Sequence, residues 1–364
     1  MSPNPLLKFC VFCGKKPKEK TNEHVIPLWL IRLTGDPNRE VYLGISSKIV
    51  AGKREFERKK YAFSSYQFPA CKKCNEKFSE LEEDVKQIIE KILNGDFLHN
   101  QQISLLLDWF DKVRTGIWLG DILLNKEFPS TKPNFHIEDR IGEKDRCLIV
   151  YEMDDDWKGL QFWGTNLPIF SIFPSCFSLG INNYYFLNIS TDFLFSMNIG
   201  FPFPEKRVFR NQDNRTIMTM HPGLNKVKLP LLKFRYEKPS IEIFQPMIHK
   251  KLLLNPEETD DLYNLEYIKS NCFNYSKGIG SIFYSESNSL VKLDNDFELC
   301  FSNNNLKYDR EKFIKIHPRQ ILDIQYYMSK DIPSVENLPT ERRKFAKADF
   351  NNLIRFQKAF RKII

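Results

Sequence analysis

The sequence lacks a long, uninterrupted apolar run. Its one extended stretch without charged residues, from Gly159 to Thr191, is interrupted by two prolines and by scattered Asn, Ser and Gln residues. A membrane-spanning helix needs about 20 consecutive, mainly apolar residues, so we expect this stretch to form buried strands instead. The start, MSPNPLLKFC, also lacks the charged and apolar segments of a secretory leader. We therefore expect a cytoplasmic protein with no membrane partner.

Several common catalytic motifs are absent as well. There is no P-loop, no GxSxG turn and no dinucleotide fingerprint. Only six histidines occur, and five of them have no ligand spacing, so we interpret those five as structural. They are His99, His136, His221, His249 and His317. These absences direct attention to the sixth histidine, His24.

The composition is that of a globular protein. Of 364 residues, 42% are hydrophobic and 27% are charged, and 31 are Phe, which indicates large buried cores. The net charge of +8 suits an anionic partner such as nucleic acid. The sign of the charge alone is weak support, because many proteins without such a partner are mildly basic.

Four of the eight cysteines form two CxxC pairs, Cys10 with Cys13 and Cys71 with Cys74. One CxxC pair can be redox-active or a coincidence, but two pairs provide the four thiolates of a tetrahedral zinc site. Four thiolates leave no open position for water, so this Zn²⁺ would be structural. The other cysteines stand singly in apolar contexts, which favours a reducing compartment over disulfides. The long gap between the pairs implies an inserted segment.

A second group of polar residues lies close to these cysteines in the sequence. Glu23 and His24 lie in TNEHVIPLWL, after the first pair, and Asn75 directly follows the second pair. The apolar spacing predicts a helix from Asn75 to Leu93 that is ended by Gly95. Asn75 and Glu82 are two turns apart on one stripe of this helix. A zinc ion would bring the His24 segment and the helix together.

A structural interpretation of these residues is also open. His24 would then cap or pack, Glu23 would be a surface acid, and Glu82 would be one of several carboxylates on its helix. For a lone histidine we would prefer this interpretation. The position of EHVIP between two cysteine pairs favours catalysis instead.

The motifs CxxCG, EHVIP and CKKCN, followed by Leu81-Glu82, resemble the HNH (ββα-metal, treble-clef) endonuclease family over the first 85 or so residues. The resemblance implies that His24 is the general base, that Glu23 and Asn75 bind one catalytic Mg²⁺ or Mn²⁺, and that Glu82 is a further ligand or supports one. Asn75 stands where the family usually has its last histidine. The middle Asn of the family falls near Tyr66, so either Ser65 and Tyr66 fix the loop or the loop differs.

The chain divides into four segments by its patterns. We expect an HNH-like zinc-containing unit over 1–95, a connecting helical segment over 96–127, and a β-rich α+β recognition or regulatory domain over 128–304. A basic helical segment follows over 305–364, in which residues 341–364 carry eight Lys or Arg and two acidic residues. That last helix either docks with a solvated basic face or touches phosphates. The predicted fold class is α+β, with a zinc unit followed by a mixed or antiparallel sheet.

The predicted strands of the third segment are short runs between turn residues. They include residues 147–153, 184–190, 193–199, 226–232, 240–244 and 297–301. A hairpin is predicted over the Asn-Asn pair at 182–183, and a helix over 260–271. Residues 101–124 are predicted to form a buried helix or a broken pair of helices.

Taken with the resemblance, the sequence favours a metal-dependent endonuclease that cleaves DNA, with RNA as the second choice. Restriction or anti-phage defence is the setting that the resemblance implies. The alternative is a non-catalytic, zinc-stabilised module that binds nucleic acid or a protein. Residues 128–364 would recognise a substrate, a partner or a signal. Sequence specificity, the trigger and the oligomeric state are left open by the sequence.

Overall fold

The structure is a computed structural model. It describes residues 9–50, 53–62, 66–124, 133–167, 169–170, 173–210, 215–223, 236–248, 265–286, 289–302 and 306–329. The predicted strand at 226–232, the basic helix at 341–364, Ser65 and His249 lie outside the described residues.

Two strands and a helix form a compact unit near the start of the chain. Strand β1 (Lys20–His24) pairs antiparallel with β4 (Gln67–Cys71), so that His24 lies opposite Gln67. Strand β4 continues directly into helix α2 (Lys72–Asn94). The helix predicted from Asn75 is therefore confirmed, and it begins three residues earlier. Its end at Gly95 is also confirmed, because this glycine has the left-handed φ of 77° that ends many helices. We call β1, β4 and α2 the ββα unit.

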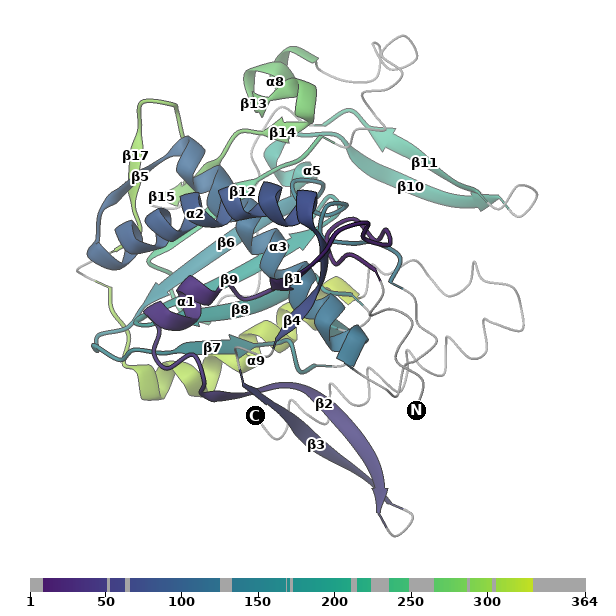
Figure 1. Cartoon of the computed structure of the whole chain (residues 1–364). Coiled ribbons are helices and arrows are strands. Elements are labelled where there is room, and N and C mark those ends of the chain that lie inside the picture. Colours follow the sequence, from purple (N-terminus) through teal and green to yellow (C-terminus); the bar gives the residue numbers. More distant parts are fainter. Residues whose placement is uncertain are drawn as a thin grey trace.

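The segment between β1 and β4 begins with the short helix α1 (Leu28–Leu33). It continues into an antiparallel hairpin made of β2 (Glu40–Val50) and β3 (Lys53–Ala62). The hairpin projects away from the rest of the protein (Figure 1). This is the inserted segment that the long gap between the cysteine pairs implied.

Residues 100–124 form one continuous helix, α3 (Asn100–Leu124), and not a broken pair. Most of its side chains are buried, as the nearly all-round apolar pattern predicted. On one side it packs against α2. On the other side Phe110 contacts Phe177 and Phe186 of the sheet, with ring centroids 6.3 and 5.5 Å apart. Helix α3 therefore lies between the ββα unit and the sheet (Figure 1).

The centre of the molecule is a seven-stranded sheet in which every pair is antiparallel, in the order β16-β15-β12-β6-β9-β8-β7. Its strands are β6 (Asp145–Glu152), β7 (Leu160–Trp163), β8 (Cys176–Ile181), β9 (Tyr184–Thr191), β12 (Ile241–Gln245), β15 (Phe283–Glu286) and β16 (Ser289–Lys292). The uncharged stretch from Gly159 to Thr191 supplies three of these strands, which confirms its prediction as a buried β-rich region.

Alternating residues of the sheet fill two separate cores. On β6, Leu148 and Val150 face the core that also contains α2 and α3, whereas Ile149 and Tyr151 face a second core. The second core is closed by helix α9 (Arg310–Ser329), which covers the opposite side of the sheet (Figure 1). A strand with both faces covered is apolar on both sides. This explains why these strands read as continuous apolar runs.

The hairpin over Asn182 and Asn183 is confirmed, because Ile181 pairs with Tyr184 across it. Asn182 has a φ of 53°, a conformation that Asn tolerates better than most residues. The strand predicted over 193–199 is wrong. This segment contains the single-turn helix α5 (Ser196–Ile199), because the Asp145 carboxylate accepts hydrogen bonds from the backbone amides of Phe195 and Ser196.

Smaller elements complete the described part of the chain. They are strands β5 (Phe97–His99), β10 (Phe203–Arg210), β11 (Arg215–His221), β13 (Cys272–Asn274), β14 (Ile279–Gly280) and β17 (Glu298–Cys300), helix α8 (Leu265–Ser270) and the 3₁₀ turn η3 (Tyr275–Lys277). The α+β class with an antiparallel sheet is confirmed. The proposed boundaries between the four segments stay a prediction, since one continuous apolar core joins the ββα unit, α3 and one face of the sheet.

Candidate metal centre and neighbouring charge cluster

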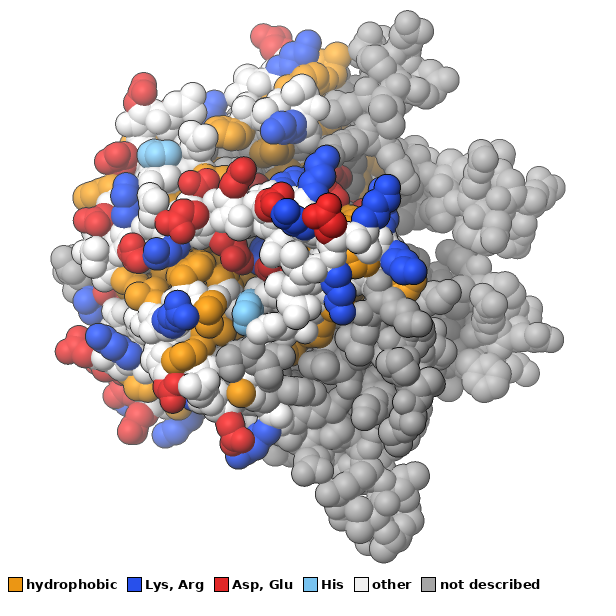
Figure 2. Space-filling model, viewed as in Figure 1, with side chains coloured by type: hydrophobic (Ala, Val, Ile, Leu, Met, Phe, Trp, Pro, Cys, Tyr) orange, Lys and Arg blue, Asp and Glu red, His pale blue; other side chains and the backbone are white. Residues whose placement is uncertain are grey.

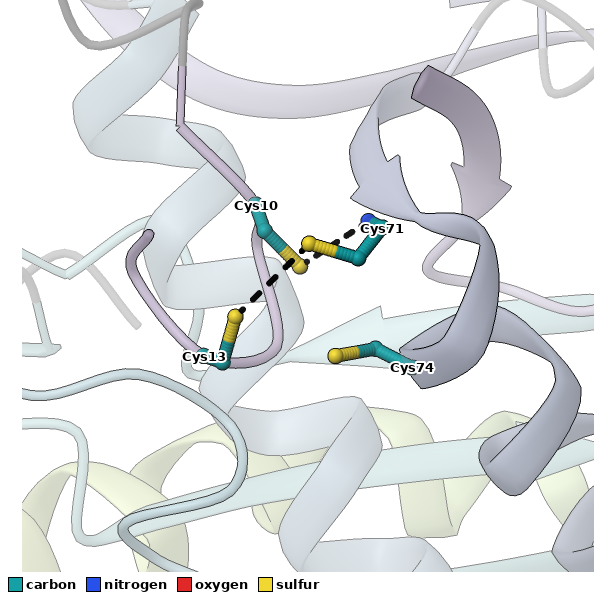
Figure 3. A group of neighbouring side chains, drawn as sticks. All are labelled: Cys10, Cys13, Cys71 and Cys74. Carbon is teal, nitrogen blue, oxygen red and sulfur yellow. Dashed lines mark hydrogen bonds between the residues drawn. The ribbon is translucent and has the colours of Figure 1, made fainter. Parts of the chain in front are cut away.

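The four predicted cysteines converge. Their sulfur atoms all lie within 4.8 Å of one another, and Figure 3 shows them turned toward a common point. The Sγ atoms of Cys13 and Cys71 are 3.9 Å apart. A tetrahedral zinc site with Zn–S bonds of about 2.3 Å requires sulfur atoms about 3.8 Å apart. The group can therefore hold a metal ion such as zinc.

Local backbone geometry explains why the first pair forms a tight knuckle. Gly14 has a φ of 69°, and a Cβ atom at this position would lie 2.4 Å from the His136 ring, so that only glycine fits. The Gly14 amide donates to the Cys10 carbonyl over 2.9 Å and closes the turn. The Val11 amide donates to the Pro69 carbonyl on β4 over 2.9 Å, which aligns the knuckle with the second pair.

The second pair is placed by the start of α2. Cys71 is the residue before the first helical position, and Cys74 lies in the first turn. The Cys71 amide donates to the Cys10 sulfur over 3.2 Å. Because a helix start presents free amides, it stabilises negative charge on nearby sulfur atoms. The sequence pattern thus builds the metal-binding group from one loop and one helix terminus.

Crowding of the thiols affects how they ionise. Burial and the neighbouring Cys10 raise the pKa of Cys71 to about 11, and burial and Cys10 also raise the pKa of Cys74. For Cys10, burial acts to raise the pKa, but backbone amides of Cys13 and Cys71 lower it below its ordinary value. The first thiolate therefore forms readily, whereas four thiolates together require a bound cation.

The predicted glutamates meet at a residue that the sequence analysis did not select, Lys112 of α3. Its ammonium donates to Glu23 Oε1 over 2.6 Å and also to Glu82 Oε1. Lys112 has no exposed side-chain surface, and the side chains of Glu23 and Glu82 are 8% and 18% exposed. The ammonium also lies 5.7 Å from the ring centroid of Phe12 in the knuckle. We call Glu23, Lys112 and Glu82 the triad.

The triad contains two carboxyl groups and one ammonium group. Burial acts to lower the pKa of Lys112, but Glu82 and Glu23 outweigh it and raise this pKa above its ordinary value. Burial raises the pKa of Glu82, Lys112 opposes this rise, and Glu23 adds to it. With both glutamates ionised, the triad carries one negative charge more than it can balance internally. Such an excess attracts a further cation or a proton.

His24 lies beside the triad at the end of β1. It acts on Glu82 electrostatically, so the two side chains are close in space. Its Nε2 atom is 2.7 Å from the amide nitrogen of Gln67, its partner across the β1–β4 ladder. An amide nitrogen only donates, so in this arrangement His24 Nε2 accepts a hydrogen bond.

The two remaining residues of the predicted site are Asn75 and Tyr66. Asn75 is half-buried on α2, about 10 Å along the helix axis from Glu82 by the rise of seven residues. Its role as a metal ligand stays a prediction. Tyr66 is buried, and its hydroxyl donates to the Ile117 carbonyl of α3 over 3.2 Å. This hydrogen bond links the residue before β4 to α3, and the substitution of Tyr66 for the family's middle Asn stays a prediction.

Among the described residues, the four cysteines are the only set of three or more His, Cys, Asp or Glu side chains close enough to hold one ion. The catalytic cation predicted at Glu23, Asn75 and Glu82 therefore stays a prediction, and the two carboxylates expected to bind it both contact Lys112 instead. Lys112 could have been found from the sequence, because a charged run, Asp111-Lys112-Val113-Arg114, interrupts a buried apolar helix. Gln67 had no comparable signal, since only the strand register pairs it with His24.

The distribution of charge on the surface bears on the prediction that the protein binds nucleic acid. On the face shown in Figure 2, acidic and basic side chains of the described residues are interspersed, without a continuous basic area.

Of the helices in the described part of the chain, none is long and apolar enough to cross a bilayer. Comparisons with protein-family models, curated proteins and solved structures found no match to the chain.

Proposed function

We propose that the protein is a metal-dependent HNH-type endonuclease that hydrolyses phosphodiester bonds of DNA. The observation that supports this best is the course of the chain through the ββα unit. Strand β1 ends at His24, β4 lies beside it, and α2 leaves from the second cysteine pair with Glu82 on it. This arrangement brings an imidazole and two carboxylates together next to a cysteine cluster.

His24 is the proposed general base. Its accepting Nε2 atom can take a proton from a water molecule that attacks the phosphorus atom. The neighbouring carboxylates then stabilise the imidazolium that forms. Gln67 donates to the single lone pair of this nitrogen, so the attacking water would have to displace the Gln67 amide before His24 can take its proton.

The second component is one Mg²⁺ or Mn²⁺, for which Glu23, Glu82 and Asn75 are the proposed ligands. Their oxygen atoms are the donor type that these cations prefer. A bound cation would supply Lewis-acid stabilisation of the phosphate and the leaving oxygen. The cysteine cluster, filled by Zn²⁺, would fix the knuckle to the start of α2 and do no chemistry.

The decisive experiment is cleavage of plasmid DNA by the zinc-loaded protein with Mg²⁺ or Mn²⁺. We expect His24→Ala to lower the rate at least about 100-fold, the usual contribution of a general base. His99→Ala is the matched control, because it removes a histidine that lies on β5, outside the ββα unit. Equal cleavage by the wild type and His24→Ala would refute the catalytic role of His24. A structured RNA in parallel reactions tests the second substrate class.

A second candidate is a non-catalytic, zinc-stabilised module that binds nucleic acid. The observation that favours it is the triad, because carboxylates that are paired with a buried lysine also suit a purely structural role. Salt-sensitive binding of DNA without cleavage under any divalent cation would support this candidate. Absence of binding at low salt would favour a protein-interaction module.

A further inference from the structure

Lys112 occupies an unusual position for a lysine. Its ammonium is fully buried, donates to both Glu23 and Glu82, and faces the ring of Phe12. No residue of the ββα unit supplies this charge, because Lys112 comes from α3. The unit therefore depends on a neighbouring element for the cation between its two carboxylates.

A divalent cation at the Glu23–Glu82 pair would use the same oxygen atoms that Lys112 now contacts. A single ammonium leaves one negative charge unbalanced, whereas one divalent ion would balance both carboxylates. We propose that Lys112 is the built-in competitor of the divalent cation at this pair, so that Lys112 sets the affinity of the candidate site for metal. The inference takes from the proposed function only that a divalent cation binds at Glu23 and Glu82.

The opposite side of α3 explains why Lys112 is not easily displaced. Asp111, the preceding residue, pairs with Arg114 over 2.5 Å and with Arg146 of β6 over 3.3 Å. Arg146 also pairs with Asp108, one turn earlier on α3. These contacts fix the rotation and height of α3 against the sheet. The position of the lysine at the candidate site is thus determined by the sheet.

The test is a titration of the zinc-loaded, full-length protein with Mn²⁺, in which free Mn²⁺ is followed by electron paramagnetic resonance. Lys112→Met removes the ammonium and keeps most of the side-chain volume. We expect it to bind Mn²⁺ roughly tenfold or more tightly than the wild type, since two uncompensated carboxylates remain. Lys112→Arg keeps the charge and should not show this gain. Lys144→Met is the matched control, because Lys144 pairs with Asp192 instead.

Unchanged Mn²⁺ affinity in a folded Lys112→Met protein with full zinc content would overturn the proposal, since a merely structural lysine would not tune metal affinity. Should this variant not fold, Lys112→Gln, which keeps hydrogen-bonding groups but no charge, decides the question by the same titration. Tighter Mn²⁺ binding by Lys112→Gln than by the wild type supports competition, and an unchanged affinity overturns it.

The two proposals fail in different ways. Competition for Mn²⁺ without any DNA cleavage would refute the endonuclease and leave the role of Lys112 standing. Cleavage that depends on His24, combined with Mn²⁺ affinity that ignores Lys112, would refute this inference alone.

Discussion

The ββα unit and the sheet body, meaning the seven-stranded sheet with α9, handle buried polar groups in opposite ways. Around the ββα unit lie groups that do not balance internally: four neighbouring thiols, two of them from the loop before β1, and the triad, whose ammonium comes from α3. The sheet body buries one set of charges that does balance, and a separate carboxyl, Asp145 of β6, that is held by backbone amides and the Ser196 hydroxyl. At its contact with α3, Arg146 and Arg114 face Asp108 and Asp111.

The amides of the sheet body complete this balance. Gln245 accepts from Arg146 Nε over 3.1 Å, and Asn188 accepts from Arg114. A buried charge without a partner is costly, so a stable core pairs its charges. An excess of one type of ligand group is tolerated where a cation completes it. The difference is the reason why we propose ion binding beside the ββα unit and not within the sheet body.

Metal removal should produce the largest contrast between the two regions. Structural zinc contributes on the order of 10 kcal/mol to small zinc-binding folds. We expect a strong chelator to abolish hydrogen-exchange protection in β1, β4 and the start of α2, while β6 and β9 stay protected. Cys13→Ser should lower the zinc content, whereas Cys272→Ser, outside the cluster, should not. Equal loss of protection in the sheet would show that the two regions unfold together.

Breaking the balanced network should have the next largest effect. Arg146→Met leaves Asp108 and Asp111 without their shared partner, and we expect a loss of about 3–5 kcal/mol in the free energy of unfolding. Urea denaturation measures this loss. The control is Lys144→Met, which breaks a partly exposed pair with Asp192 and should cost about 1 kcal/mol or less. Similar costs for both variants would argue against a special role for the buried network.

The smallest expected effect is on how the free energy of unfolding of the sheet body depends on pH. Burial lowers the pKa of His317 to about 3, and its Nε2 atom lies 2.7 Å from the Ser178 hydroxyl. The folded pKa is below the unfolded value of 6.5, so the unfolded state binds more protons and stability falls as the pH decreases from about 6.5 toward 3.

At pH 5.5 this single residue should cost about 1.4 kcal/mol relative to neutral pH. His317→Gln cannot titrate, so the difference between its unfolding free energies at pH 7.5 and pH 5.5 should be smaller than in the wild type by that amount. An identical pH dependence in the two proteins would show that His317 does not titrate as a buried group.

Local patterns were sufficient to predict much of the fold. The apolar spacing of α2, the glycine that ends it and the Asn-Asn turn between β8 and β9 were all correct, because each depends on neighbours along the chain. The strand expected over 193–199 failed because a remote carboxylate, Asp145, caps the amides of Phe195 and Ser196. That competition cannot be seen in a short window of sequence.

In the candidate site, too, the local features were predictable from the sequence and the long-range contacts were not. Two CxxC pairs were enough to predict the cysteine cluster, because the spacing of thiols within a knuckle is a local property. Only the tertiary structure placed Lys112 between Glu23 and Glu82, and Gln67 against His24. These contacts join residues that are far apart in the sequence, and they depend on how α3 packs and on the register of two strands. The thiols and the two carboxylates were thus determined by sequence, and the ammonium that balances only one of these carboxylates was placed by packing.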